Sequence, residues 1–197
     1  MASPSDICNV ALANIGHKPE VVSIDPPDGG SYSTHCARFF AVARDMALEE
    51  HAWTFAVARF SLAQDDEASV PDRWEYGYVI PSDMIRPIAV FADDCADETA
   101  GILEYEIEGS NLFCNEESVT LKYIFRADDT SKWTPSFADA VSWKLAVYLS
   151  GSIVKGDAGL RQFCEKMYQQ ALAKAMGFSA NSSRVRPEHI PVWMRDR

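Results

Sequence analysis

Apolar residues recur at helical spacing in two stretches near the start of the chain, and each stretch is bounded by residues that start or stop helices. The first follows Ser3 and Pro4, a capping serine with proline in the first turn, and Gly16 marks its end. The second begins near Ser31, after a run of proline and glycine, and fades around His51. The pattern therefore predicts two amphipathic helices in this part of the chain.

Two further helical stretches lie near the other end of the sequence. Thr134 precedes Pro135, again a cap followed by proline, and the apolar stripe that follows ends at Gly156. The last stretch starts near Leu160 and carries a broad apolar face, and Gly177 stands where a C-terminal cap belongs. We therefore expect a second pair of helices, the last of which ends at Gly177.

Between the helix pairs, apolar and polar residues alternate, which is typical of strands with one buried face. Residues 103–108 alternate without a break, so three apolar side chains are expected to face a core and three glutamates to face solvent. Residues 109–111 predict a turn, and residues 112–115 predict the returning strand. Residues 119–126 alternate as well, although Ile124 puts an apolar side chain on the outer face. The three glutamates are Glu104, Glu106 and Glu108.

The segments before this hairpin are less regular. Residues 53–63 are rich in aromatic and small residues and predict either a strand or a helix tail. Residues 64–71 form an acidic loop, and residues 74–80 predict a short edge strand that ends at Pro81. Residues 88–91 predict one more short strand. The middle of the chain is therefore expected to be an antiparallel β-meander.

This order of elements predicts an α+β fold, in which a helical bundle carries an inserted β lobe. The bundle is expected to comprise residues 1–63 and 132–177, and the β-rich insert residues 64–131. Residues 178–197 are expected to form an extended C-terminal arm.

The arm differs in chemistry from the rest of the chain. It contains two prolines, four arginines and only two acids, together with apolar residues that would be unfavourable on a free tail. An extended segment with an aromatic anchor and arginines is typical of a segment that docks on another protein. The alternative is a tail that folds back on its own domain. The candidate docking residues are Arg184, Arg186, Ile190, Val192, Trp193 and Arg195.

The formal net charge of the 197 residues is −11, and it is distributed unevenly. The arm carries about +2, whereas the remainder carries 14 basic against 27 acidic residues. Residues 93–117 alone contain nine carboxylates and neither lysine nor arginine. Such a surface repels phosphate, so ordinary binding of DNA or RNA is not expected.

The sequence gives no sign of export or of a membrane span. It lacks an apolar run of the necessary length, and its first residues do not form a basic region followed by an apolar stretch. The five cysteines are widely spaced without a Cys-x-x-Cys pair, so neither a disulfide framework nor a zinc site is predicted. Reduced thiols favour a protein that is made and assembled in a cytoplasm.

Motifs for catalysis or cofactor binding are lacking in the sequence. The four histidines form no metal-binding pair, and neither a phosphate-binding loop nor a nucleophile elbow occurs. His35 and Cys36 are neighbours, but adjacent residues on a helix point in different directions, so a half-buried histidine is expected instead of a catalytic dyad. We therefore expect no catalytic residues, no metal site and no cofactor.

The carboxylates are the only residues in the sequence that are plausible catalytic groups. A glycan hydrolase needs two acids that face each other across the sugar, one of them buried so that its pKa is raised. That alternative would draw on Glu104, Glu106, Glu108, Glu116 and their neighbours. A solvated charged face is favoured, because buried unpaired carboxylates are rare.

Residues 51–56 have the sequence His-Ala-Trp-Thr-Phe-Ala. Together with other segments between residues 5 and 155, they resemble the head-to-tail adaptor proteins of short-tailed phages, the tail tubular protein A family. The family's box is His-Pro-Trp-Asn-Phe-Ala, from which this sequence departs at Ala52 and Thr54. The similarity is specific in combination, consists of structural residues in a fixed order and contains no catalytic signature. The remaining matches are residues 6–16, Cys36, Phe40, Ala43, Arg44, Asp45, Leu48, Trp74, Tyr76, Tyr78, Pro81, Asp83, Arg86, Glu108, Gly109, Asn115, Tyr123, Ile124, Trp133, Pro135 and Phe137.

The resemblance implies a structural virion protein that is assembled in the host cytoplasm. Such adaptors form a homo-oligomeric ring, typically of twelve subunits, between the portal protein of the head and the tail nozzle protein. The resemblance also implies that the C-terminal arm docks on the portal and that the β lobe faces the tail.

An acidic wall suits a channel that passes double-stranded DNA, because a basic wall would hold the phosphates tightly. In this hypothesis Glu104, Glu106 and Glu108 lie either on the channel wall or on an outer acidic face. Two other hypotheses compete with the adaptor: a tail-associated cell-wall glycan hydrolase, and a monomeric regulatory binding module without affinity for virion parts.

Overall fold

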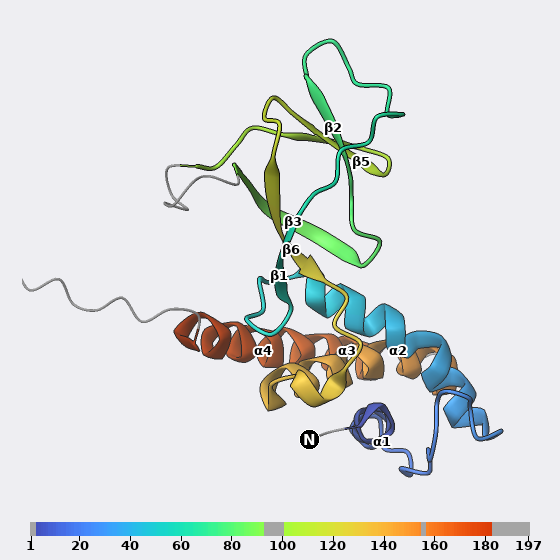
Figure 1. The fold of residues 1–197 in the computed structure, drawn as a ribbon. Coiled ribbons are helices and arrows are strands. Elements are labelled where there is room, and N and C mark those ends of the chain that lie inside the picture. Colours follow the sequence, from blue (N-terminus) through green and yellow to red (C-terminus); the bar gives the residue numbers. More distant parts are fainter. Residues whose placement is uncertain (1–2, 93–100, 155–156, 183–197) are drawn as a thin grey trace, which may run out of the picture.

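The computed structural model describes residues 3–92, 101–154 and 157–182 (Figure 1). Within these ranges the chain forms four α-helices, one short 3₁₀ helix and two small antiparallel sheets, which confirms the α+β fold. Figure 1 shows the β lobe on one side of the helical layer and α1 on the other. The helices are α1 (Pro4–Asn14), α2 (Ser31–Glu49), η1 (Thr130–Lys132), α3 (Pro135–Ile153) and α4 (Ala158–Ser182). The strands are β1 (Val57–Ser61), β2 (Tyr76–Val79), β3 (Met84–Ala92), β4 (Glu106–Glu108), β5 (Asn111–Cys114) and β6 (Val119–Phe125).

The predicted helix starts are confirmed where capping residues stand. Ser3 forms a capping box with Asp6: its hydroxyl accepts from the Asp6 backbone N–H at 3.1 Å, and its own N–H donates to the Asp6 carboxylate at 2.9 Å. At α3, the Thr134 hydroxyl accepts from the Phe137 N–H at 3.3 Å, and Pro135 follows the cap. These side chains satisfy N–H groups that a helix terminus would otherwise leave without a partner.

The predicted helix stop at Gly177 is wrong, because α4 continues to Ser182. Glycine in a helix costs only about 0.5–1 kcal/mol, and contacts of the following turn offset this cost. Ser179 is buried and its hydroxyl accepts from the Thr54 N–H at 3.4 Å. The Ser182 hydroxyl donates to the Phe178 carbonyl at 2.8 Å. Residues 178–182 are therefore helical and do not belong to an extended arm, while residues 183–197 lie outside the described part of the chain.

The strand order corrects one detail of the expected meander. The β4–β5 hairpin forms as predicted, with Gly109 in the left-handed region at φ +60° in its turn. The next strand leaves the hairpin, however, since the two sheets have the orders β1-β6-β3 and β2-β5-β4. Residues 53–63 thus contain a strand, β1, and this strand pairs with β6. The predicted division placed residues 1–63 with the bundle, whereas β1 within that range pairs in a sheet of the lobe.

Strand β6 is central because it is apolar on both faces. Val119, Leu121 and Tyr123 are buried in the core of the lobe, whereas Ile124 is buried in the core of the helical bundle. The apolar residue that interrupts the outer face of this strand is thus the contact between the lobe and the helices. A strand that is covered on both sides loses strict alternation.

A group of charged residues holds the end of β6 against α2. Arg44 is 9% exposed, and its Nε lies 2.7 Å from Asp45 Oδ1. Its Nη1 pairs with Asp128, which follows β6. Asp45 also accepts from Arg126 Nε at 3.2 Å. Because the cation is almost buried and bonded to carboxylates from two segments, it fixes the position of the connection that leads to α3.

Candidate functional site

The three glutamates of the predicted acidic face point to solvent, as expected. Only residues 106–108 form a strand, but the alternation continues back to residue 103, with half-buried Leu103, Tyr105 and Ile107 between the exposed glutamates. The apolar residues of this alternation pack on the core of the lobe. The acidic side chains therefore share one face because their neighbours are held in the lobe core.

Two of these glutamates have partners that the sequence did not indicate. Arg73 pairs with Glu104, and Trp74 Nε1 donates to Glu106 Oε2 at 2.8 Å. The Arg73 guanidinium also lies 4.9 Å from the centroid of the Trp74 ring, within cation–π range. The ion pair is more than 60% exposed on both sides, so it contributes little stability. Its main effect is to neutralise one charge of the acidic face.

The four glutamates named for a hydrolase do not form a buried pair. Glu104, Glu106 and Glu108 lie on one exposed face, and Glu116 is exposed in the turn between β5 and β6. A general acid of a glycosidase is protonated because burial raises its pKa. These four positions do not supply such an environment.

Residues 51–56 and 133–137 meet in one aromatic cluster at the base of the lobe. The rings of Trp53 and Phe137 are 4.8 Å apart, those of Phe55 and Phe137 5.0 Å, and those of Trp133 and Phe137 4.9 Å. Trp53 is fully buried, and its Nε1 donates to the Ala47 carbonyl at 2.9 Å. Phe40 of α2 stacks on Trp133 at 6.2 Å. Edge-to-face rings at these distances join the connections on both sides of the lobe to the helices.

The histidine and the thiol considered as a dyad have separate surroundings. His35 is half-buried, as expected, whereas Cys36 is fully buried and faces the Cys8 thiol of α1. Hydrogen bonding to Cys36 and burial raise the pKa of Cys8, so this thiol stays protonated. His51 lies with its ring 5.0 Å from Trp53, and burial together with the charge of Arg86 lowers its pKa. Each of these side chains has a packing role.

Neither a metal cluster nor a membrane helix occurs among the residues that the structure describes. No three or more histidine, cysteine, aspartate or glutamate side chains in these ranges gather as metal ligands do. None of the described helices has both the length and the apolar composition to cross a bilayer.

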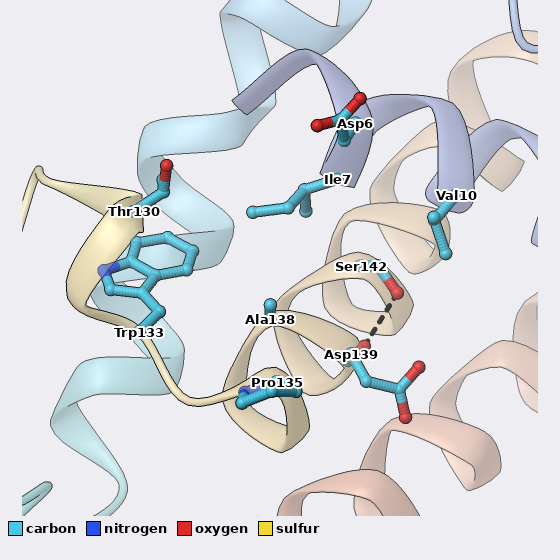
Figure 2. Close-up of a pocket in the computed structure, with 9 residues that line it drawn as sticks. All are labelled: Asp6, Ile7, Val10, Thr130, Trp133, Pro135, Ala138, Asp139 and Ser142. Atoms are coloured by element: carbon cyan, nitrogen blue, oxygen red, sulfur yellow. Dashed lines mark hydrogen bonds between the residues drawn. The ribbon is translucent and has the colours of Figure 1, made fainter. Parts of the chain in front are cut away.

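A groove of about 470 Å³ opens between α1 and the N-terminal end of α3 (Figure 2). Its walls are mostly apolar, and two carboxylates stand at its edge. Hydrogen bonds from the backbone and hydroxyl of Ser3 lower the pKa of Asp6, which is therefore ionised at neutral pH. The lining residues are Asp6, Ile7, Val10, Thr130, Trp133, Pro135, Ala138, Asp139 and Ser142.

A second hollow of about 500 Å³ lies on the other side of Pro135 and Asp139, between α3 and α4. Lys174 and Phe178 of α4 line it, and Phe178 is 55% exposed. Sequence reasoning missed both hollows, because each depends on how the helices pack. Each hollow has one exposed apolar residue, Val10 in the first and Phe178 in the second.

The six candidate docking residues of the arm lie outside the described ranges. No family model matches the chain. A search of curated proteins finds no match either.

Proposed function

We propose that this protein is a structural adaptor in the neck of a tailed virus. In this proposal several copies close into a ring of about twelve subunits between the portal and the tail nozzle. The ring passes double-stranded DNA during ejection and binds none of it specifically. The chain acts through its shape and its contacts, and catalyses no reaction.

The observation that carries the proposal is the convergence of the segments that resemble the adaptor family. Residues 51–56 and 133–137 are far apart in the sequence, yet Trp53, Phe55, Trp133 and Phe137 form one cluster. The segments that resemble the family thus include the packing centre of the chain. Their meeting point joins the lobe to the helices, so the shared residues maintain an architecture and not an active site.

The exposed acidic face supports the part of the proposal that concerns DNA. Glu106 and Glu108 stand on the surface of a chain whose net charge is −11. On a wall of this kind carboxylates outnumber cations, and Arg73 is paired with Glu104, so few counterions are displaced from DNA and the duplex slides past it. We assign Glu104, Glu106 and Glu108 either to the channel wall or to the outer face of the ring next to it.

The portal contact is assigned to the segment that follows α4. It supplies arginines (Arg184, Arg186 and Arg195) and apolar anchors (Ile190, Val192 and Trp193) on a chain that is otherwise acidic. Aromatic residues and arginines contribute most of the binding energy in protein interfaces. Because Phe178 and Ser179 belong to α4, a deletion that tests the arm must begin after Ser182 and not at residue 178.

The test mixes the purified full chain with portal particles from the same genome and measures co-sedimentation. Trp193→Ala combined with Arg184→Glu and Arg186→Glu is expected to reduce binding by at least tenfold without changing the circular dichroism spectrum. Phe163→Ala, at another exposed aromatic residue, is the control and is expected to bind normally. Equal binding by the triple variant and the wild type would contradict the assignment of the arm.

The glycan hydrolase is tested separately on the same preparation. Zymography with cell-wall glycan in the gel is expected to show no clearing. Clearing that is lost in Glu104→Gln or Glu106→Gln would favour the hydrolase over the adaptor.

A further inference from the structure

We propose that the C-terminal segment, residues 183–197, occupies the groove between α1 and α3 of its own chain in the free subunit. This proposal does not depend on the adaptor function, because it concerns a contact within one molecule. It rests on the chemistry of the groove, on the chemistry of the segment and on the place where α4 ends.

The groove offers an apolar floor with a negative edge (Figure 2). Ile7, Trp133 and Ala138 line it, and Val10 remains 46% exposed at its side. Its two charged residues, Asp6 and Asp139, are both acids, so none of the nine lining residues is basic. An apolar surface with carboxylates at its edge fits a ligand that combines an aromatic side chain with cations.

The segment has this combination. Trp193 is flanked by Val192 and Met194, and Arg195 follows two positions later. A tryptophan buries about 150–250 Å² of surface when it packs, and a groove of about 470 Å³ has room for one together with a neighbouring aliphatic side chain. Arg195 and Arg197 are opposite in charge to Asp6 and Asp139, so the groove and the segment are complementary in charge and in apolar character.

The position of the end of α4 brings the segment to this groove. Helix α4 runs back along α3, so its last turns lie beside the start of α3, where Phe178 and Lys174 share the second hollow with Pro135 and Asp139. Pro135 and Asp139 also line the groove between α1 and α3. Trp193 lies eleven positions after Ser182, and an extended chain spans about 3.3 Å per residue, which gives a reach of about 36 Å.

The order of charges along the segment also matches the order of charges along the two hollows. Glu188 comes first and would pass the second hollow, whose cation is Lys174. Trp193 and Arg195 come later and would reach the groove with its two carboxylates. Phe178, four positions before the end of α4, is exposed in the second hollow and gives the path an apolar contact.

The occupant is the chain's own segment and not that of a second copy. A short tether gives the segment an effective concentration in the millimolar range, well above the concentration of free subunits. Pro187 and Pro191 also restrict the unbound segment, so less conformational entropy is lost when it docks.

The direct test places the photo-crosslinking residue p-benzoylphenylalanine at position 193 of the full chain, at low micromolar concentration. Irradiation and peptide mapping are expected to show cross-links within one chain to residues 6–10 and 133–142. The same residue at position 60, an exposed position on β1 of the lobe, is the control and should not label these peptides. Cross-links from position 193 only to other surfaces, only between chains, or only at the level of the control would overturn the proposal.

A second test fills the groove and measures amide hydrogen exchange of the segment. Ala138→Trp is expected to increase exchange in residues 188–197 at least tenfold relative to the wild type, because the segment is displaced. Ala173→Trp, at an exposed position of α4 outside both hollows, is the matched control and should leave exchange unchanged. Circular dichroism verifies that both variants are folded, and Asp139→Lys replaces Ala138→Trp if the latter does not fold. Equal exchange in the groove variant and the control would overturn the proposal.

Discussion

The helical bundle and the β lobe are built differently, although they share one strand. The bundle has a continuous core that includes four helices and the aromatic cluster around Phe137. The lobe has two sheets of three strands each, and its core contains eight buried residues. Its edges leave Phe60 53% exposed and Val79 49% exposed. The comparison indicates that the bundle provides most of the stability of the chain, while the lobe mainly provides exposed surface.

The largest loss of stability is expected from Phe137→Ala. Phe137 is fully buried and contacts the rings of Trp53, Phe55 and Trp133, so the substitution leaves a cavity at the joint. The free energy of unfolding in urea should fall by about 3–5 kcal/mol. Phe163→Ala, at a ring that is 50% exposed and packs edge-to-face on Trp143, should lower it by only about 1–2 kcal/mol. Similar losses in both variants would contradict the central role of the cluster.

A smaller and local loss is expected from Leu112→Ala in the lobe. Leu112 is fully buried in β5, and its replacement should cost about 2–4 kcal/mol. Because the lobe has its own core, amide exchange should rise in β2, β4 and β5 and stay unchanged in α3. A uniform rise across both regions would show that the lobe and the bundle open as one unit.

The joint between the two regions is tested by Arg44→Met, which keeps an unbranched apolar stem and removes the guanidinium charge. Asp45 retains Arg126 as a partner, and Asp128 is 71% exposed, so the loss should be limited to about 1–2 kcal/mol in urea unfolding. Lys132→Ala removes an exposed ion pair with Asp129 and should cost less than about 0.5 kcal/mol. An equal effect of the two substitutions would mean that burial of Arg44 does not matter.

The smallest effect concerns acid sensitivity near α1 and α2. The Ser33 hydroxyl and the backbone N–H groups of Val22 and Gly30 lower the pKa of Asp28 below its ordinary value of 3.8. The folded state therefore binds the Asp28 proton more weakly than the unfolded state does. The stability that ionised Asp28 contributes is complete above pH 3.8 and is lost as the pH falls below it. Asp28→Asn should flatten the decline of stability between pH 4 and 2, as measured by thermal unfolding.

Glu20→Gln, at an exposed acid, is the control for this pH series and should retain the wild-type slope. The same slope in Asp28→Asn and in the wild type would contradict the role of these hydrogen bonds.

Short-range signals predicted those parts of the fold that depend on neighbouring residues. The caps at Ser3 and Thr134 were predictable because each satisfies N–H groups within three positions. Gly177 failed as a stop because Ser179, two residues later, is held by Thr54, a contact that the local pattern does not contain. The pairing partners of β6 also depend on segments far away in the sequence. Only Ile124, an apolar residue on its outer face, indicated that this strand is buried on both sides.

The candidate site was predictable only in part, for the same reason. Alternation in residues 103–108 predicted the exposed glutamates, since it depends on the chain's own period. The partner Arg73 comes from a loop 31 positions away from Glu104, so no local pattern could indicate it. The groove forms because the small Ala138 faces α1, which depends on how the two helices pack.

The most direct test of the adaptor proposal is electron microscopy of the full chain mixed with the portal protein of the same genome. The proposal predicts an additional ring of density at one end of the portal, with the rotational symmetry of a closed oligomer. Portal particles that remain unchanged, together with a chain that stays monomeric by light scattering at the same concentration, would contradict it.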